Sequence, residues 1–493
     1  MLFKFLIHNS CFIIPSLGLL TPHLLWNCPR PNGAGTEIQA FHKRCGVDDL
    51  LVRLCYTFKH KMSMTKKLSF ALISATFLLF LPISEASAES GRFFIKSSSN
   101  FWKTALGARH NFNNGFSAEL SDFQFRFAKL FGIKIEPVDV LNILEDTEVK
   151  TKSDDVLAET PLVDLPNLPT VRAASASEGT PIDTSGNNNK GKSPSNQRTT
   201  PSDQTPWGVE VVYDDPSVAL TSGGLGVNVA VLDTGVFISH PDLINRIEGC
   251  KDFTDFRKPI IDGKCEDKNG HGTHVAGIIA GDAGSDGLGI YGIAPMASIS
   301  AFRVCGNNGS CFADDIAAAI IDAADNNVNI INMSFGSDSN SGLIKNAIDY
   351  AVSRGVLMVA AAGNDGPFIG SIDYPAAYLS VVGVGGVDPL LAVAEWSSRG
   401  SNSETEEFVV EEGDIEFAMP GENIESAWPV GGYTILSGTS MAAPFLTGLA
   451  AKYWQADDED PAGATRKFLQ SLAEDINEPG DDDASGFGLP RVK

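Results

Sequence analysis

Residues 227–235 read VNVAVLDTG, an apolar run rich in valine that ends in an aspartate, a threonine and a glycine. Such a run predicts a strand that is buried on both faces. Helix-like stretches and further apolar runs alternate after it, at 275–280, 313–325, 329–334, 343–353 and 356–362. Buried strands separated by helices indicate an α/β domain in three layers, a parallel sheet with helices on both faces. Functional groups are then expected at the carboxyl ends of the strands, where Asp233 stands.

The composition is that of a globular protein with an acidic surface. Of the 493 residues, 43% are apolar and 20% are charged, and the formal net charge is −24. The length favours more than one folded unit. Acidic runs such as 457–460 and 481–483 are typical of a solvated surface. The excess of negative charge argues against nucleic acid or an anionic membrane as a partner.

An export signal is predicted inside the chain rather than at its first residue. Lys66 and Lys67 precede an apolar run at 68–81, and small residues follow at 86–88, the three-part pattern of a secretory signal peptide. The run is shorter than the roughly 20 residues that span a bilayer, so no stable membrane anchor is expected. We therefore interpret 1–61 as an N-terminal extension before the true start and 62–88 as the signal peptide. The alternative, a signal at 1–20, is weakened by the interruption at His8 and Asn9.

Export predicts a secreted protein, either extracellular or in the periplasm of a two-membrane bacterium. Residues 89–145 then read as a small α+β unit, 146–204 as a polar linker rich in Ser, Thr, Pro and Asn, and 205–493 as the main domain.

Four cysteines lie in the main domain: Cys250, Cys265, Cys305 and Cys311. In an exported chain their short spacings suggest that Cys250 pairs with Cys265 and Cys305 with Cys311. Four cysteines permit three connectivities, and buried free thiols are the alternative.

Two downstream motifs carry side chains suited to nucleophilic chemistry. His271 lies in NGHGTHVAG (269–277), and Ser440 lies in SGTSMAAP (437–444), which predicts its hydroxyl at a helix N-terminus. A serine hydroxyl needs a base to take its proton, and the imidazole needs an anion to hold its tautomer. Asp233 supplies that anion. His271 and His274 lack the glutamate of a HExxH motif, which argues against zinc.

The motifs DTG (233–235), HGTHVAG (271–277) and GTSMA (438–442) together resemble those of the subtilisin-like serine proteases, the subtilases, in the same Asp, His, Ser order. The resemblance implies a subtilisin-like catalytic domain over 205–493. It further implies a serine endopeptidase that cleaves proteins and peptides through an acyl-enzyme on Ser440, with His271 as general base and Asp233 orienting it. No cofactor is implied for catalysis.

The resemblance also assigns roles in binding. Asn364, in AGNDG (362–366), matches the family residue that donates to the oxyanion beside the backbone amide of Ser440; a turn asparagine is the alternative. The segment Ser334-Phe335-Gly336 matches the edge that binds substrate backbone as an added strand. The small residues Ala360, Ala361 and Ala362 are expected to leave room for P1, the substrate side chain on the acyl side of the cut bond, and Ala361 and Gly363 are expected to bind substrate.

Asp373, in IDYPA (372–376), resembles a residue at the floor of the P1 pocket. A carboxylate there favours a P1 arginine or lysine. Alternatively, Asp373 turns aside to cap a loop or to hold a cation, which leaves a broad apolar pocket. Both interpretations stay open.

Accessory parts follow from the same resemblance. NGFSA (114–118) is similar to part of the family's propeptide, which assists folding and blocks the cleft until it is cut, so a self-processed zymogen with its own propeptide as inhibitor is implied. Structural calcium is also implied, with Asp242, Asp282 and Asp286 as candidate ligands and an ordinary surface loop as the alternative. We expect a monomer.

Two rival functions are disfavoured. An esterase of the α/β-hydrolase type needs glycines two residues either side of the serine and the order Ser, Asp, His, and the chain has neither. A binding protein on the same fold would have no chemical need for Asp233, His271, Ser440 and Asn364 together.

Overall fold

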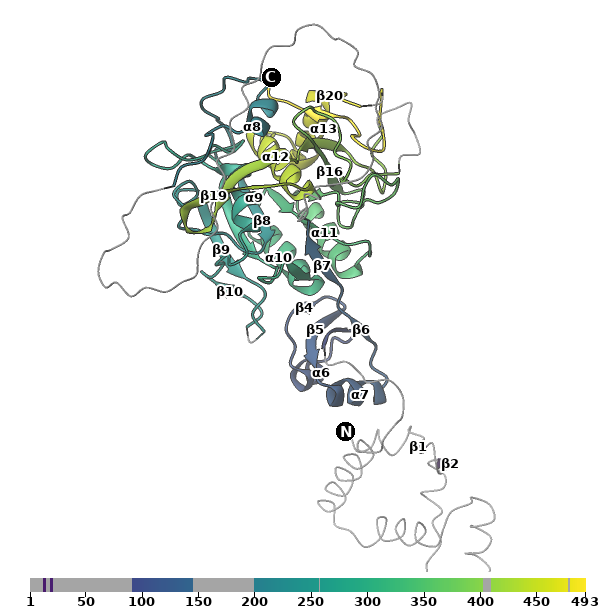
Figure 1. Ribbon diagram of the computed structural model, residues 1–493. Helices are drawn as coiled ribbons and strands as arrows, with labels where there is room; N and C mark the ends of the chain where they lie inside the picture. Colours follow the sequence, from purple (N-terminus) through teal and green to yellow (C-terminus); the bar gives the residue numbers. More distant parts are fainter. Residues whose placement is uncertain are drawn as a thin grey trace, which may run out of the picture. The chain divides into compact units, whose positions relative to one another are not determined.

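The computed structural model describes residues 12–14, 18–20, 91–144, 199–256, 258–401, 409–477 and 479–493 (Figure 1). The predicted signal peptide and most of the predicted linker lie outside the described residues. In the predicted N-terminal extension, β1 (Phe12–Ile14) and β2 (Gly18–Leu20) pair antiparallel.

The main domain is built on an eight-stranded sheet within the described residues. Its strand order is β10-β9-β11-β8-β13-β15-β16-β17, and the neighbouring strands run parallel except at the β10 edge. The strands are β8 (Asn228–Asp233), β9 (Ile247–Asp252), β10 (Ile261–Asp262), β11 (Ser298–Arg303), β13 (Ile330–Met333), β15 (Leu357–Ala361), β16 (Val381–Val387) and β17 (Phe417–Pro420). The strands predicted from the three apolar runs are β8, β13 and β15, each within two residues of the predicted ends.

Helices cover both faces of this sheet (Figure 1). They are α8 (Trp207–Val212), α9 (His271–Ala280), α10 (Ala313–Asp325), α11 (Gly342–Ser353), α12 (Thr439–Lys452) and α13 (Pro461–Leu472). Side chains of β8 alternate between the two faces because a strand has a period of two. Val229 and Val231 pack in one core with α9 and α12, and Ala230 and Leu232 pack in the other with α10 and α11. The predicted three-layer α/β fold is thus confirmed.

Short antiparallel pairs border the sheet, and the sequence reading did not predict them. They are β18 (Ile424–Trp428) with β19 (Gly432–Leu436), joined by η1 (Pro429–Gly431), and β20 (Ala473–Glu474) with β21 (Leu489–Pro490). In the part of the chain that the structure describes, no helix combines the length and the apolar character needed to cross a bilayer.

The predicted small unit is described from residue 91 to residue 144. It forms an antiparallel sheet in the order β4-β5-β3-β6. Its elements are β3 (Gly91–Ile95), α6 (Asn100–Leu106), β4 (Asn111–Phe112), β5 (Gly115–Leu120), α7 (Asp122–Leu130) and β6 (Ile135–Pro137). Helix α7 begins with a capping box between Ser121 and Gln124. The α+β prediction for this unit agrees with these elements.

Candidate active site

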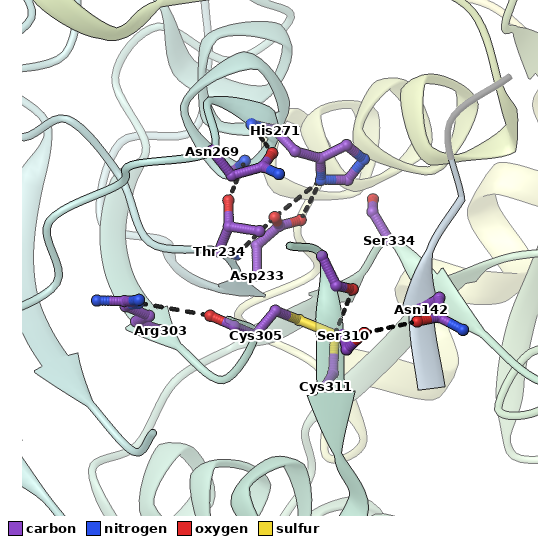
Figure 2. The surroundings of a disulfide bond; sticks show 12 residues. Asn142, Asp233, Thr234, Asn269, His271, Arg303, Cys305, Ser310, Cys311 and Ser334 are labelled. Carbon is purple, nitrogen blue, oxygen red and sulfur yellow. Dashed lines mark hydrogen bonds and ion pairs between the residues drawn. A yellow bond between two sulfur atoms is a disulfide. The ribbon is translucent and has the colours of Figure 1, made fainter. Parts of the chain in front are cut away.

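Asp233 and His271 form a buried pair at the carboxyl edge of the sheet (Figure 2). Asp233 is the last residue of β8, and His271 is the first residue of α9. The imidazole Nδ1 lies 2.8 Å from Asp233 Oδ1 and 2.9 Å from Oδ2, and both residues are fully buried. Because Nδ1 donates to the carboxylate, the neutral ring carries its lone pair on Nε2. The pair therefore presents a basic nitrogen whose tautomer is fixed.

The approach of α9 to β8 requires a glycine. A Cβ atom added at Gly272 would lie 2.1 Å from the carbonyl oxygen of Gly235 and 2.9 Å from Asp233 Cβ. Any larger residue would push the first turn of α9 away from the strand and separate His271 from Asp233.

Asp267 ties the two segments together. Its Oδ1 accepts hydrogen bonds from Thr234 Oγ1 (3.0 Å) and from the backbone of Gly270 (2.8 Å), and its Oδ2 accepts from Thr273 N (3.0 Å) and Oγ1 (2.6 Å). Thr234 follows Asp233, and Thr273 lies in the first turn of α9. The bond from Thr273 N satisfies one of the backbone N–H groups that the start of a helix leaves open, and α9 begins at His271 rather than at residue 275. Sequence reasoning missed Asp267, although an aspartate just before a helical run is a capping signal.

Ser440 is the second residue of α12, at a helix N-terminus as predicted. Its hydroxyl donates to the backbone carbonyl of Ser334 (2.9 Å) and accepts from the backbone N–H of Leu144 (3.1 Å). Ser334 Oγ in turn donates to the Ser440 carbonyl (3.0 Å). Helices α9 and α12 pack against each other, so the first turns that carry His271 and Ser440 belong to neighbouring helices. Ser440 is fully buried in this arrangement.

Hydrogen bonds to the side-chain oxygen of Asn364 fix the orientation of its amide group. Asn364 Oδ1 accepts from Thr439 N and from Thr439 Oγ1, both at 3.0 Å. The amide nitrogen, Nδ2, is buried and has no hydrogen-bond partner among the described residues. Since Thr439 immediately precedes Ser440, the bonds fix a free donor beside the serine. A buried donor left open in this way is costly unless a ligand accepts from it.

An extended segment of the small unit runs past these residues. Strand β7 (Val140–Ile143) lies between β12 (Ser310–Phe312) and β14 (Phe335–Gly336) and pairs antiparallel with both. Asn142 lies opposite Gly336, and Ile143 donates its N–H to the carbonyl of Gly309 (3.0 Å). Leu144 follows and reaches Ser440. The predicted edge at 334–336 therefore holds an added strand, and that strand comes from the chain itself.

A second contact joins the small unit to the start of α10. The carboxylate of Asp315 accepts hydrogen bonds from Arg109 Nε (3.1 Å), His110 Nε2 (2.8 Å) and Arg92 Nη1 (2.7 Å). Arg92 Nη1 also donates to Asp314 (3.2 Å). We call these five residues the docking cluster; each has less than 10% of its side chain exposed. Burial raises the pKa of Asp315, but the bond from His110 and the charges of Arg109 and Arg92 outweigh it, and the pKa is lowered overall.

Each disulfide borders the site. Cys305 and Cys311 close the loop that leads into β12, and Figure 2 places this bond between the Asp233–His271 pair and β7. Cys250 and Cys265 are joined two residues before Asp267. These are the same two pairs that the spacing suggested.

The predicted P1 residues divide into two groups. The side chain of Ala361 packs into the core with α9 and α12, whereas Ala360 and Ala362 pack into the other core. Gly363 and Gly336 instead border Asp373, since a Cβ at either would lie within 3.0 Å of its Oδ2. Asp373 is 2% exposed, and its pKa is raised to about 7 by burial and by the charges of Asp365 and Asp338.

The three candidate calcium ligands, Asp242, Asp282 and Asp286, each have a different partner. Asp242 Oδ2 accepts a hydrogen bond from Ile290 N (2.9 Å). In the same loop, the side-chain Nε2 of Gln204 donates to the carbonyl oxygens of Gly287 and Gly289. Asp282 pairs with Arg246 (3.1 Å), and Asp286 accepts from Leu288 N (3.1 Å). The three aspartates therefore have separate partners within the chain, and their role as calcium ligands stays a prediction.

Known proteins are similar to this chain over its main domain. Residues 224–488 match the model of the subtilase family. A subtilisin from Bacillus sp. (strain TA39) is 45% identical over 311 residues, which cover 59% of this chain and 73% of the relative. M-protease from Shouchella clausii (strain KSM-K16) is 37% identical over 291 residues, covering 59% and 70%. The solved structure of Sphericase has 47% identity and a TM-score of 0.58, covering 59% of this chain and 99% of that one.

Replacing Asp267 should loosen the site. Asp267→Ala leaves several buried N–H and O–H groups without an acceptor, so we expect the free energy of unfolding to fall by about 3 kcal/mol. Denaturant unfolding of the full chain measures this change. As a control, Asp262→Ala removes an exposed carboxylate and should change the value by no more than about 0.5 kcal/mol. An equal effect of both substitutions would contradict the role given to Asp267.

Proposed function

This chain belongs to the subtilase family of serine proteases, and on that premise we propose that it is an exported serine endopeptidase made as a self-processed zymogen. The observation that carries the proposal is the seating of residues 140–144, an extended segment flanked by two strands and ending on the hydroxyl of Ser440. A peptide held in that way is a substrate in position. Proteins and peptides are accordingly the proposed substrates.

The proposed reaction is acyl transfer. Ser440 Oγ attacks the carbonyl carbon of the substrate and loses its proton to Nε2 of His271. Asp233 stabilises the imidazolium through the Nδ1 bond at 2.8 Å. His271 then gives the proton to the leaving amine, and water hydrolyses the ester by the reverse steps. The family needs no cofactor for this chemistry.

The oxyanion of each tetrahedral intermediate would be stabilised by Asn364 Nδ2 and by the backbone N–H of Ser440. Support comes from the unused amide hydrogens of Asn364 and from the position of Ser440 at the start of α12. Donors that are fixed before the reaction lose no energy to reorganisation while charge develops.

We assign the self-processing bond to Leu144–Glu145. Asn142 pairs with Gly336 and Ile143 with Phe335, so the next residue, Leu144, falls opposite Ser334 in the same register. Its N–H already meets Ser440 Oγ, which makes Leu144 the P1 residue. The propeptide is then 89–144, one residue shorter than the predicted 89–145. The linker 146–204 and the catalytic domain 205–493 follow it.

The small unit is the proposed intramolecular inhibitor. It occupies the substrate edge with β7 and anchors through the docking cluster, where two arginines face two buried aspartates. Burial makes such pairs costly to break one partner at a time. Calcium held by Asp242, Asp282 and Asp286 is proposed as a structural ion only.

Ser440→Ala should abolish both peptide hydrolysis and self-processing, because one nucleophile performs both reactions. Mass spectrometry of the purified chain measures the outcome: wild type should release a fragment that ends at Leu144, and the variant should stay intact. Release of the same fragment by the purified variant would assign the cut to another protease. A wild-type fragment that ends at Ile143 would correct the P1 assignment.

Asn364→Ala should lower kcat by about 100- to 1000-fold with little change in KM, the magnitude known for the equivalent donor of a subtilisin. Steady-state kinetics on a peptide substrate measures both constants. Asn364→Asp is the matched control for position, because it keeps an oxygen for Thr439 but removes the donor; it should lose kcat as well. A raised KM at unchanged kcat would refute the assignment.

Arg109→Ala should weaken the hold of the cut propeptide, because it leaves Asp315 buried with less compensation. We expect the lag between cleavage and the appearance of activity to shorten by about tenfold or more, which corresponds to about 1.4 kcal/mol. The lag is measured per processed molecule, so that a lower folding yield does not enter. Lys96→Ala, which removes an exposed charge paired inside the small unit with Glu136, should leave it unchanged. Equal lags in both variants would show that the docking cluster does not hold the propeptide.

A further inference from the structure

Three aspartates from separate loops converge next to β14, the strand that pairs with β7. Asp338 follows β14, Asp365 follows Asn364, and Asp373 lies between Gly336 and Gly363. Each offers a carboxylate oxygen, and these oxygens all lie within 4.8 Å of one another. We call the three residues the acidic cluster. Its members are brought together by folding, since Asp338 and Asp373 are 35 positions apart in the sequence.

Asp373 is the buried member and lacks a partner. It is 2% exposed, and its Oδ1 has no hydrogen-bond partner within the described residues. In the same part of the chain, neither it nor Asp338 or Asp365 pairs with a basic side chain. A buried carboxylate needs a cation or donors to remain charged, and two more carboxylates nearby increase that need.

A cation from the substrate does not meet this need in the zymogen. Leu144 occupies the P1 position, and its side chain is uncharged. When the chain's own segment is seated, the substrate supplies no counter-charge, so the carboxylates either take up a proton or bind another cation. A seated Leu144 thus favours the interpretation in which Asp373 holds a cation over the one in which it pairs with a basic P1 side chain.

The donor set fits calcium. All the ligand atoms are carboxylate oxygens, which hard cations prefer, and the cluster contains no histidine or cysteine for a softer metal. Two oxygens that each lie about 2.4 Å from one calcium ion are at most about 4.8 Å apart. Asp338 and Asp365 are exposed, which leaves room for the water ligands that complete a coordination shell of six to eight.

We propose that Asp338, Asp365 and Asp373 bind a calcium ion beside the P1 position, and that this ion, rather than a basic P1 side chain, neutralises the three carboxylates. Its location at P1 rests on the proposed function. The ion differs from the one proposed near Asp242. With the charge satisfied, the adjoining space is suited to apolar P1 residues such as Leu144.

Calcium counting tests the proposal without relying on activity. The full-length Ser440→Ala chain, which cannot digest itself, is dialysed to equilibrium against calcium, and the bound ions per chain are counted. Adding Asp338→Asn and Asp365→Asn should remove one ion per chain. Both sites are exposed and the change is isosteric, so the fold should persist; a retained unfolding transition checks this. Asp262→Asn, an exposed aspartate outside the cluster, should keep the full number.

An unchanged calcium number in the Asp338→Asn, Asp365→Asn chain would overturn the proposal. A P1 series on the active enzyme gives a second reading: the proposal expects leucine to be preferred over arginine. A preference for arginine that disappears in the double variant would assign the cluster to the substrate and also overturn it. Failure of the active enzyme to cut any peptide would count against the proposed function, while the calcium count would still decide the metal site.

Discussion

The buried carboxylate of Asp267 is the constraint on which the site depends. Asp233 and His271 come from a strand and a helix, with 37 residues between them, and their hydrogen bond requires the two atoms to lie about 2.7–3.2 Å apart. Asp267 bonds to the residue after Asp233 and to the first turn of α9. Gly272 permits the close approach that these bonds demand. The geometry of the pair is therefore set by groups that take no part in the proposed chemistry.

Main-chain pairing organises the remainder of the site. Strand β7 is bound on one edge by β12 and on the other by β14, so its recognition uses backbone groups that every residue carries. Leu144, the next residue, likewise reaches Ser440 through its backbone N–H. The disulfide between Cys305 and Cys311 closes the loop that carries Gly309 and leads to β12. One wall of the binding edge is thus covalently tied back onto the domain.

The sequence was sufficient for the parts that depend on local patterns. Apolar runs predicted β8, β13 and β15, and motif order predicted the candidate residues Asp233, His271 and Ser440, because strand burial and chemical roles are encoded in short segments. The motif of Ala361 does not indicate which core it packs into, since its direction depends on strand register against two packed layers. The docking cluster and the acidic cluster join residues far apart in the chain, so no local pattern indicates them. The predicted signal peptide lies outside the described residues and stays a prediction.

Strand β7 also indicates which backbone hydrogen bonds a peptide must lose elsewhere in order to bind in the same way. A segment that forms hydrogen bonds along both edges cannot at the same time belong to a helix or to the interior of a sheet, because its N–H and C=O groups are already engaged. A folded protein must first release about five consecutive residues into an extended form, as residues 140–144 already are. The rate of cutting would then follow the free energy of local opening in the target more than its sequence. An enzyme of this kind distinguishes proteins by how firmly they hold their own backbone.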